Sequence, residues 1–178
     1  MQFTSIVMPF LRMTRGSVTV LSSSAGEKPW PGHTIYNSAM ASLNMMIRCA
    51  ALENSHHQVR VNAVAPGYVR SFAARSNTEF HNSLTQQQNQ AIIGEAATNT
   101  PLLGYTGTTK DGRDGQYIYQ IQEPLDCAMQ MLWLGSMEAS FINGEIVILD
   151  GGMHISSSNY AQYVQQAEEA DRIMANQD

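Results

Sequence analysis

A serine and a tyrosine are spaced along the chain in a way that could support acid–base chemistry. Ser23 follows the β-branched run at residues 17–21, and Tyr36 comes thirteen residues later, near the start of an apolar helical stretch. A second strand-like run ends in Pro66-Gly67. Open α/β proteins bind ligands at the carboxyl ends of parallel strands, so these residues can converge on one ligand there. Neither hydroxyl group would be informative alone, whereas the ordered set is.

The elements that position these residues alternate between helix and strand. Apolar residues at three- and four-residue spacing predict helices, and β-branched or alternating runs predict strands. The predicted helices cover residues 1–15, 34–53 and 125–137, and the predicted strands cover residues 17–21, 58–64 and 145–149. This alternation indicates an α/β protein with a parallel sheet.

The ordered set resembles the short-chain dehydrogenase/reductase family. The likeness runs from about Phe3 to Met153, with an insertion near residues 105–120 that its Asp-Gly pairs mark as a hairpin. It includes the tripeptides Arg60-Val61-Asn62 and Asp150-Gly151-Gly152. The resemblance implies an α/β fold with a partial Rossmann-like, doubly wound parallel sheet, made of the last strands and helices of the family fold.

The resemblance also implies a reaction, which is hydride transfer between NAD(P) and a carbonyl or alcohol carbon. In that scheme Ser23 hydrogen-bonds the substrate oxygen, and Tyr36 is the general acid/base. The nicotinamide end of the cofactor would be held by the backbone at Pro66, Gly67 and Val69, and the cofactor phosphates would lie near the hydroxyl of Ser71.

Position 40 departs from the family's Tyr-x-x-x-Lys pair. Here the pair reads Tyr36 and Met40, and the chain has two lysines in all, Lys28 and Lys110. The family lysine stabilises the tyrosinate with its positive charge and holds the nicotinamide ribose. A thioether has no charge and donates no hydrogen bond, so Met40 does neither. Losing acid–base tuning alone is expected to lower a rate by on the order of 10²–10⁴-fold.

A glycine-rich phosphate loop is the second departure from the family. No two of the 13 glycines are two positions apart, so neither G-x-G-x-x-G nor the family's Gly-x-x-x-Gly-x-Gly can be written. The backbone amides of such a loop hold the cofactor pyrophosphate. We therefore expect no cofactor for this chain alone, and NAD(P) if an N-terminal half from elsewhere completes the fold.

Composition and charge exclude several classes of protein. Hydrophobic residues make up 43% and charged residues 14%, which argues against a disordered chain. The net charge is −5 and the basic residues do not cluster, so we expect no nucleic-acid partner. No apolar stretch approaches the roughly 20 residues that span a bilayer.

Cys49 and Cys127 indicate an intracellular, reducing compartment, either the cytoplasm or the mitochondrion. The side chains of His56 and His57 are expected to diverge, so we expect no metal site.

Residues 153–178 are predicted to be a C-terminal helical tail outside the half-domain of residues 1–152. Apolar side chains follow 3-4 spacing along the tail at Tyr160, Tyr163, Ala167, Ala170 and Met174. The tail either packs on its own domain or docks on a partner.

In the family's strand order the strand before Ser23, at residues 17–21, has one further neighbour, whose absence would leave an open edge. We expect a protein partner, in a homo- or hetero-dimer, to cover this edge and the helices at residues 1–15, 34–53 and 158–176.

Two functions follow from these features. The first is a catalytically inactive subunit derived from the family, with a structural or assembly role in a larger complex, which Met40 and the lack of a glycine loop favour. The alternative is an NAD(P)-dependent oxidoreductase whose dinucleotide-binding half is supplied elsewhere, which Ser23, Tyr36 and Pro66-Gly67 favour. Titration with NADH and NADPH distinguishes the two.

Overall fold

The computed structural model describes residues 2–30, 32–69, 103–105, 117–119 and 122–156. The chain divides into two compact units, one formed by Met1–Val69 with Gln122–Asp150 and the other by Arg70–Ile121 with Gly151–Asp178. The boundary predicted at residue 152 remains a prediction. No helix in the described ranges combines the length and the hydropathy that crossing a membrane requires.

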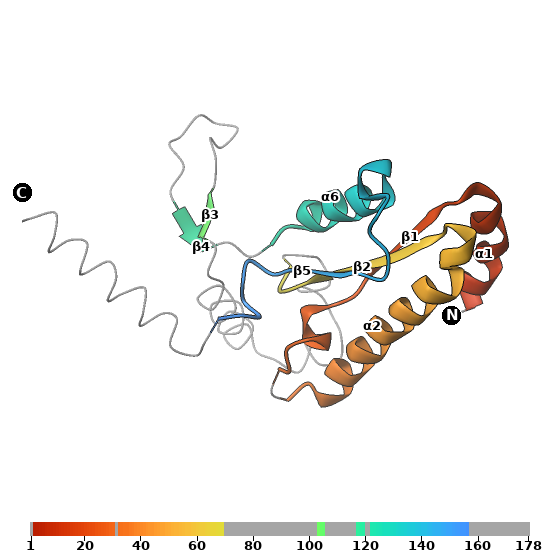
Figure 1. The fold of residues 1–178 in the computed structure, drawn as a ribbon. Helices are drawn as coiled ribbons and strands as arrows, with labels where there is room; N and C mark the ends of the chain where they lie inside the picture. Colours follow the sequence, from red (N-terminus) through yellow and green to blue (C-terminus); the bar gives the residue numbers. More distant parts are fainter. Residues whose placement is uncertain (1, 31, 70–102, 106–116, 120–121, 157–178) are drawn as a thin grey trace, which may run out of the picture. The chain divides into compact units, whose positions relative to one another are not determined.

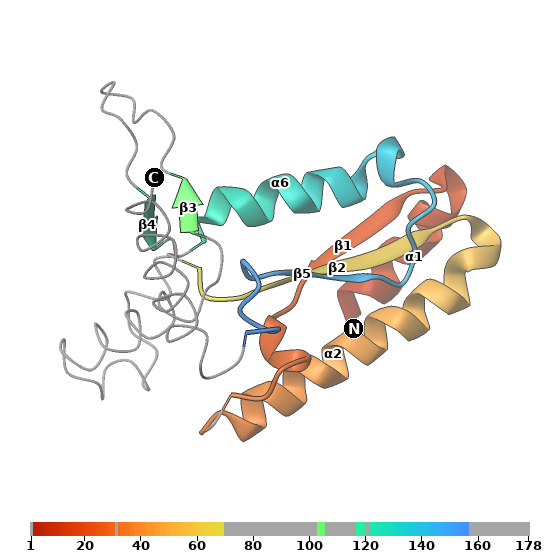
Figure 2. The same cartoon turned by 60° about the vertical axis from the view of Figure 1, so that its left-hand side comes forward.

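The first unit is built on a three-stranded parallel sheet in the order β1-β2-β5. Its strands are β1 (Ser17–Leu21), β2 (Arg60–Pro66) and β5 (Ile146–Leu149). Helices α1 (Gln2–Thr14) and α2 (Thr34–Asn54) lie on one face of the sheet and α6 (Pro124–Gly135) lies on the other, as Figures 1 and 2 show. This three-layer arrangement confirms the predicted α/β fold with a partial Rossmann-like sheet.

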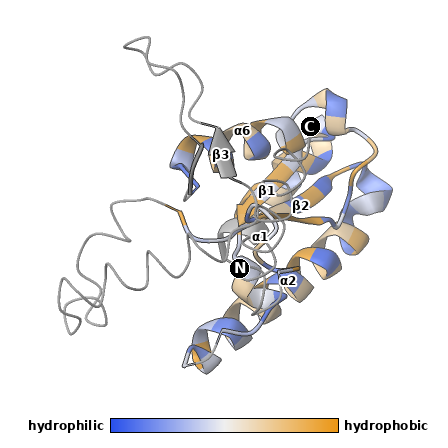
Figure 3. Cartoon of the chain, turned by 90° about the vertical axis from the view of Figure 1, so that its left-hand side faces the viewer, coloured by the Kyte–Doolittle hydropathy of each residue, from blue (hydrophilic) through white to orange (hydrophobic). Residues whose placement is uncertain are grey.

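The core lies between β2 and the two helices on its face. Every residue of β2 after Arg60 is buried, because β2 has a strand on each side and helices on both faces. Val61, Ala63 and Ala65 pack with Ile47 of α2 and Met8 of α1. Figure 3 shows hydrophobic residues along the strands between the helix layers.

Asparagines fix the entry into β5. The Asn143 carboxamide oxygen accepts a hydrogen bond from the backbone N–H of Val61 at 2.9 Å, and its nitrogen donates to an α2 carbonyl at 3.3 Å. Gly144 follows with a φ of +77°, a conformation that favours glycine. Asn62 is fully buried, and its side-chain oxygen accepts from the Glu145 N–H at 3.0 Å. Side chains from β2 and the turn therefore set the register of β5.

The C-terminus of α6 is capped by side chains from two strands. The Arg60 guanidinium, on the first residue of β2, donates to the carbonyls of Leu134 at 2.8 Å and Ser136 at 2.9 Å. The Ser17 hydroxyl of β1 donates to the Gly135 carbonyl at 3.0 Å. The last carbonyls of a helix lack intrahelical partners and carry partial negative charge, so a cation there stabilises the helix.

β1 is an edge strand of the sheet that the structure describes. The carbonyl of Gly16 and the N–H of Ser22 bond to β2, so backbone groups of even-numbered residues face β2. The backbone groups of Ser17, Thr19 and Leu21 therefore point to the open side. Within the described part of the chain the buried Thr19 hydroxyl also has no hydrogen-bond partner. A strand with one unpaired edge is a template for another strand.

The described residues of the second unit contain a β-ladder. β3 (Leu103–Tyr105) pairs antiparallel with β4 (Tyr117–Tyr119), and the insertion hairpin predicted at residues 105–120 stays a prediction. The second unit also includes a turn at residues 151–155, after β5 in the chain, where the N–H of Ile155 donates to the Gly152 carbonyl at 3.1 Å. The amphipathic helix predicted over 158–176 lies outside the described residues.

His56 and His57 lie together in the 3-10 turn η2 (Ser55–His57) that follows α2. Their ring centroids are 3.9 Å apart, so the expectation that the two side chains diverge is wrong. The tight turn places both rings on one side. Burial lowers the pKa of His57, and the neighbouring charges of His56 and Arg12 lower it further. The fold therefore favours the neutral imidazole at this position.

Acidification is expected to destabilise the fold through His57. Because the pKa of His57 is lower in the folded chain than the ~6.5 of an unfolded one, the stabilisation is present above that value and is lost as pH falls through the folded-state pKa. Melting temperatures at pH 7.5 and 5.5 should therefore differ more for the wild type than for His57→Gln. An equal difference in both proteins would contradict the assignment.

Candidate functional site

The three parallel strands end together and form the edge at which a ligand is expected. Leu21 pairs with Val64 and Pro66 with Leu149. Beyond the strands the Ser22 N–H donates to the Val64 carbonyl at 2.7 Å, and the Gly67 N–H donates to the Leu149 carbonyl at 3.0 Å. The serines after β1 and the Pro66-Gly67 pair at the end of β2 therefore lie at one sheet edge, as the sequence predicts.

Ser23 lies in a tight turn, residues 22–27, which we call the serine turn. Its backbone is extended and its side-chain oxygen accepts the Ala25 N–H at 3.2 Å, which caps the 3-10 helix η1 (Ser24–Gly26). This bond uses a lone pair and leaves the hydroxyl hydrogen available to donate to a ligand. The half-buried Ser23 can thus hold a substrate oxygen while its own position is fixed.

Gly26 allows the serine turn to lie directly on α2. A Cβ at this position would be 2.7 Å from the Asn44 side-chain nitrogen, 2.9 Å from the Met40 carbonyl carbon and 3.0 Å from the Ala41 nitrogen. Two of these atoms belong to the helix backbone and cannot move aside. A side chain at residue 26 would therefore push the serine turn away from the helix that carries Tyr36.

A chain of polar contacts ties the serine turn to α2. Asn44 is 1% exposed; its side-chain oxygen accepts from the Ser22 hydroxyl at 2.5 Å and its nitrogen donates to Glu27 at 3.0 Å. Arg48 completes the chain with an ion pair to the same Glu27 oxygen at 3.3 Å. Sequence reasoning missed these contacts. The available signal was Asn44 itself, a polar residue within an otherwise apolar stretch of the helix.

Tyr36 lies in the first turn of α2 and is 48% exposed. Met40 follows one helical turn later, so it shares a face of α2 with Tyr36. The loop before the helix is fixed to it, because the Asn37 side chain donates to the Trp30 carbonyl at 3.0 Å. Met40 is half-buried and its backbone lies against the serine turn; its side chain is a neutral thioether.

The segment after β2 contains the remaining predicted site residues. Pro66 is buried as the last residue of β2, and Gly67 and Val69 follow it half-buried, with Val69 in a parallel bridge to Gln122. Burial raises the pKa of the Tyr68 phenol above its ordinary value. Ser71 lies outside the described residues. Among the residues that are described, no three His, Cys, Asp or Glu side chains gather as metal ligands.

Comparison with known proteins identifies the family. A family model described as enoyl-(acyl carrier protein) reductase matches residues 1–106, more than half of the 178. The chain belongs to the short-chain dehydrogenase/reductase family. A solved short-chain dehydrogenase/reductase of unknown function from Caenorhabditis elegans, determined with cofactor, is similar with a TM-score of 0.66 and 25% identity. The alignment covers 90% of this chain and 53% of that one.

Curated members of the family match at similar levels. The chain is 28% identical to the 3-oxoacyl-[acyl-carrier-protein] reductase FabG of Thermotoga maritima, over 85% of this chain and 51% of the relative. It is 26% identical to the 7alpha-hydroxysteroid dehydrogenase of Bacteroides fragilis, over 87% of this chain and 50% of the relative. The chain therefore spans about half the length of these short-chain dehydrogenases/reductases.

Proposed function

We propose that the chain provides the substrate side of an NAD(P)-dependent oxidoreductase acting on a carbonyl or alcohol carbon. The observation that carries the proposal is the contact of the serine turn with α2 at Gly26, which holds Ser23 beside the helix of Tyr36. The curated relatives named above are a reductase and a dehydrogenase, which favours this function over a purely structural role.

The residues present fit one end of the cofactor. Pro66, Gly67 and Val69 at the sheet edge would hold the nicotinamide, which when bound supplies or accepts the hydride. Ser23 would donate a hydrogen bond to the substrate oxygen, and the Tyr36 hydroxyl would deliver a proton to that oxygen during reduction or remove it during oxidation. Met40 offers the ribose neither charge nor hydrogen bond. The pyrophosphate-binding residues would come from another chain or from a longer form of this one.

A second function, a catalytically inactive subunit, is favoured by Met40 and by the lack of a glycine loop in this sequence. The unpaired edge of β1 supports a partner in both cases, because a strand from elsewhere could pair with Ser17, Thr19 and Leu21. Exposed apolar side chains support helix contacts in a homo- or hetero-dimer. These side chains are Ile6, Phe10 and Met13 on α1 and Ile35, Met45 and Leu52 on α2.

Cofactor titration tests the proposal. NADH or NADPH is titrated calorimetrically into the natively purified assembly that contains the full chain. We expect saturable binding to the wild type and equal binding to Tyr36→Phe, because an exposed phenol is not needed for the fold. Carbonyl reduction should fall on the order of 10²–10⁴-fold in Tyr36→Phe. If neither nucleotide binds, the oxidoreductase function is wrong and the inactive subunit is favoured.

A further inference from the structure

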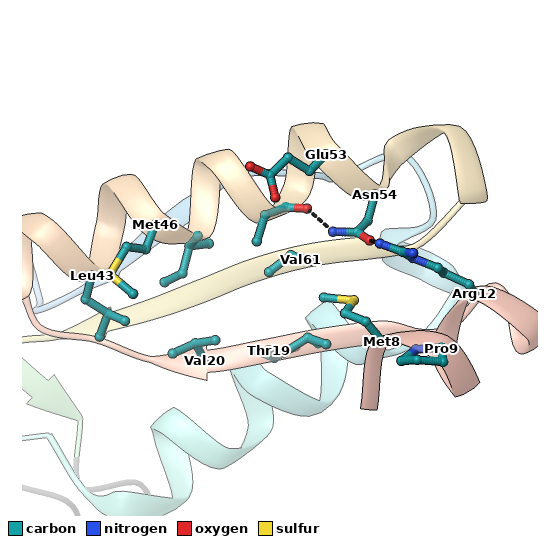
Figure 4. Close-up of a pocket in the computed structure, with 13 residues that line it drawn as sticks. Met8, Pro9, Arg12, Thr19, Val20, Leu43, Met46, Glu53, Asn54 and Val61 are labelled. Atoms are coloured by element: carbon teal, nitrogen blue, oxygen red, sulfur yellow. Dashed lines mark hydrogen bonds between the residues drawn. The ribbon is translucent and has the colours of Figure 1, made fainter. Parts of the chain in front are cut away.

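A cleft lies between α1 and α2 on the face of the sheet that they share (Figure 4). Its volume is about 710 Å³, within the ~300–1,000 Å³ typical of small-molecule sites. β1 forms the floor and α2 forms one wall, while α1 closes the end nearest Asn54. Neither Ser23 nor Tyr36 lines it, so the cleft is separate from the candidate active site.

Most of the cleft is apolar. Leu43 and Met46 of α2 lie above Val20 of β1 at the end away from α1 (Figure 4). All three side chains are half-buried, so part of their apolar surface still contacts water. Removing such surface from water stabilises a complex by roughly 25 cal/mol per Å². The elongated apolar floor suits an unbranched alkyl chain.

The other end of the cleft holds a fixed cation. The Arg12 Nε and Nη2 atoms donate to the side-chain oxygen of Asn54, at 3.0 and 2.7 Å. Asn54 is 4% exposed, and its own nitrogen donates to the Ala50 carbonyl at 2.8 Å. A guanidinium has five N–H groups, so this anchor orients Arg12 and leaves others free to bind an anion.

The charge of Arg12 is not neutralised by its acidic neighbour. Glu53 lines the same end of the cleft, yet no ion pair joins it to Arg12 in the described part of the chain. Glu53 is exposed, which weakens its repulsion of a bound anion through solvent screening. The guanidinium is therefore the charged group with fixed geometry at this end.

We infer that the cleft binds an amphipathic carboxylate, with its head group on Arg12 and its alkyl chain along Leu43, Met46 and Val20. The charge of Arg12 specifies an anion, and the planar N–H pair of a guanidinium matches the two oxygens of a carboxylate. The apolar remainder of the cleft favours an alkyl chain as the rest of the ligand. This inference does not depend on the proposed oxidoreductase function, because it uses none of that site's residues.

Decanoate, below its micelle concentration, is the test ligand for the full chain. We expect saturable shifts of the Met8 and Met46 methyl resonances in NMR, assigned with Met→Leu variants. Decanol shares the tail without the charge and should bind about tenfold more weakly, since a hydrogen bond to a charged group contributes roughly that factor or more. Acetate shares the head without the tail and should give no saturable shift.

Three variants separate charge from shape. Arg12→Gln should weaken decanoate about tenfold and leave decanol unchanged, so its decanol affinity also reports that the cleft is intact. Glu53→Gln should tighten decanoate, and Ala50→Trp should fill the cleft and abolish both. Absence of saturable shifts in the wild type would overturn the inference. So would equal affinities for decanoate and decanol, or an equal loss of both in Arg12→Gln.

Discussion

Replacing Met40 with lysine is expected to raise the rate of NADPH-dependent carbonyl reduction by about 10²–10⁴-fold. Residue 40 lies one helical turn after Tyr36 on the same face of α2, so a lysine there would place its ammonium near the phenol. A cation stabilises the tyrosinate that remains after proton transfer and can hydrogen-bond a ribose. The measurement is NADPH oxidation by the natively purified assembly with an acetoacetyl thioester as the test substrate.

Two neutral variants serve as controls for the lysine. Met40→Gln restores a hydrogen-bond donor of similar length without charge, and we expect it to raise the rate less than tenfold. Met40→Leu conserves volume and should match the wild type. If the lysine and glutamine variants gain equally, hydrogen bonding rather than charge was missing. If NADPH binds and no variant gains, Met40 is not what limits the chemistry.

Replacing Gly26 with alanine is expected to destabilise the fold by about 1–3 kcal/mol, the usual effect of forcing extra volume into a packed site. The added methyl would meet backbone atoms of Met40 and Ala41 at 2.9 and 3.0 Å. Relief requires the serine turn to lift from α2, which would also strain the bond between Ser22 and Asn44. Urea unfolding followed by circular dichroism measures the free energy.

Gly135→Ala is the matched control for Gly26→Ala. A Cβ at Gly135 would meet nothing nearer than the Ser17 hydroxyl at 3.9 Å, and the residue ends a helix. We expect this variant to be as stable as the wild type or more stable by up to about 1 kcal/mol, because alanine loses less backbone entropy on folding. Equal stability of both alanine variants would show that the serine turn does not need its close approach.

Local sequence signals predicted most of the sheet. β1 was predicted at the residues it occupies, because Gly16 and the serines bound a short β-branched run. β2 begins two residues later than predicted, since Gln58 adopts a φ of +60° at the end of a 3-10 turn. It also continues through Pro66, whose backbone pairs with Leu149 of β5. That extension depends on a strand more than 80 positions away in the numbering, which no local pattern reports.

The candidate site was predictable where it follows from strand ends and unpredictable where it depends on tertiary contacts. Ser23 follows the end of β1 and Pro66 ends the adjacent parallel strand β2, so topology alone brings them to one edge. Asn44 bonds Ser22 and Glu27, which lie 22 and 17 positions before it in the chain, and its role appears only when helix and turn are packed. The hydrogen bond between Arg12 and Asn54 joins residues 42 positions apart, so the spacing of residues along the chain could not predict it either.

Because Arg60 belongs to β2 and caps α6, the C-terminal end of α6 and the start of β2 are expected to unfold together. Its guanidinium holds carbonyls of the helix end while its backbone begins the central strand, so fraying of either end breaks bonds of the other. Amide hydrogens in the last turn of α6 should therefore exchange with solvent in the same cooperative unit as those at the start of β2. We therefore expect the last turn of α6, ordinarily the first part of a helix to unfold, to be protected from exchange as well as the start of β2 is.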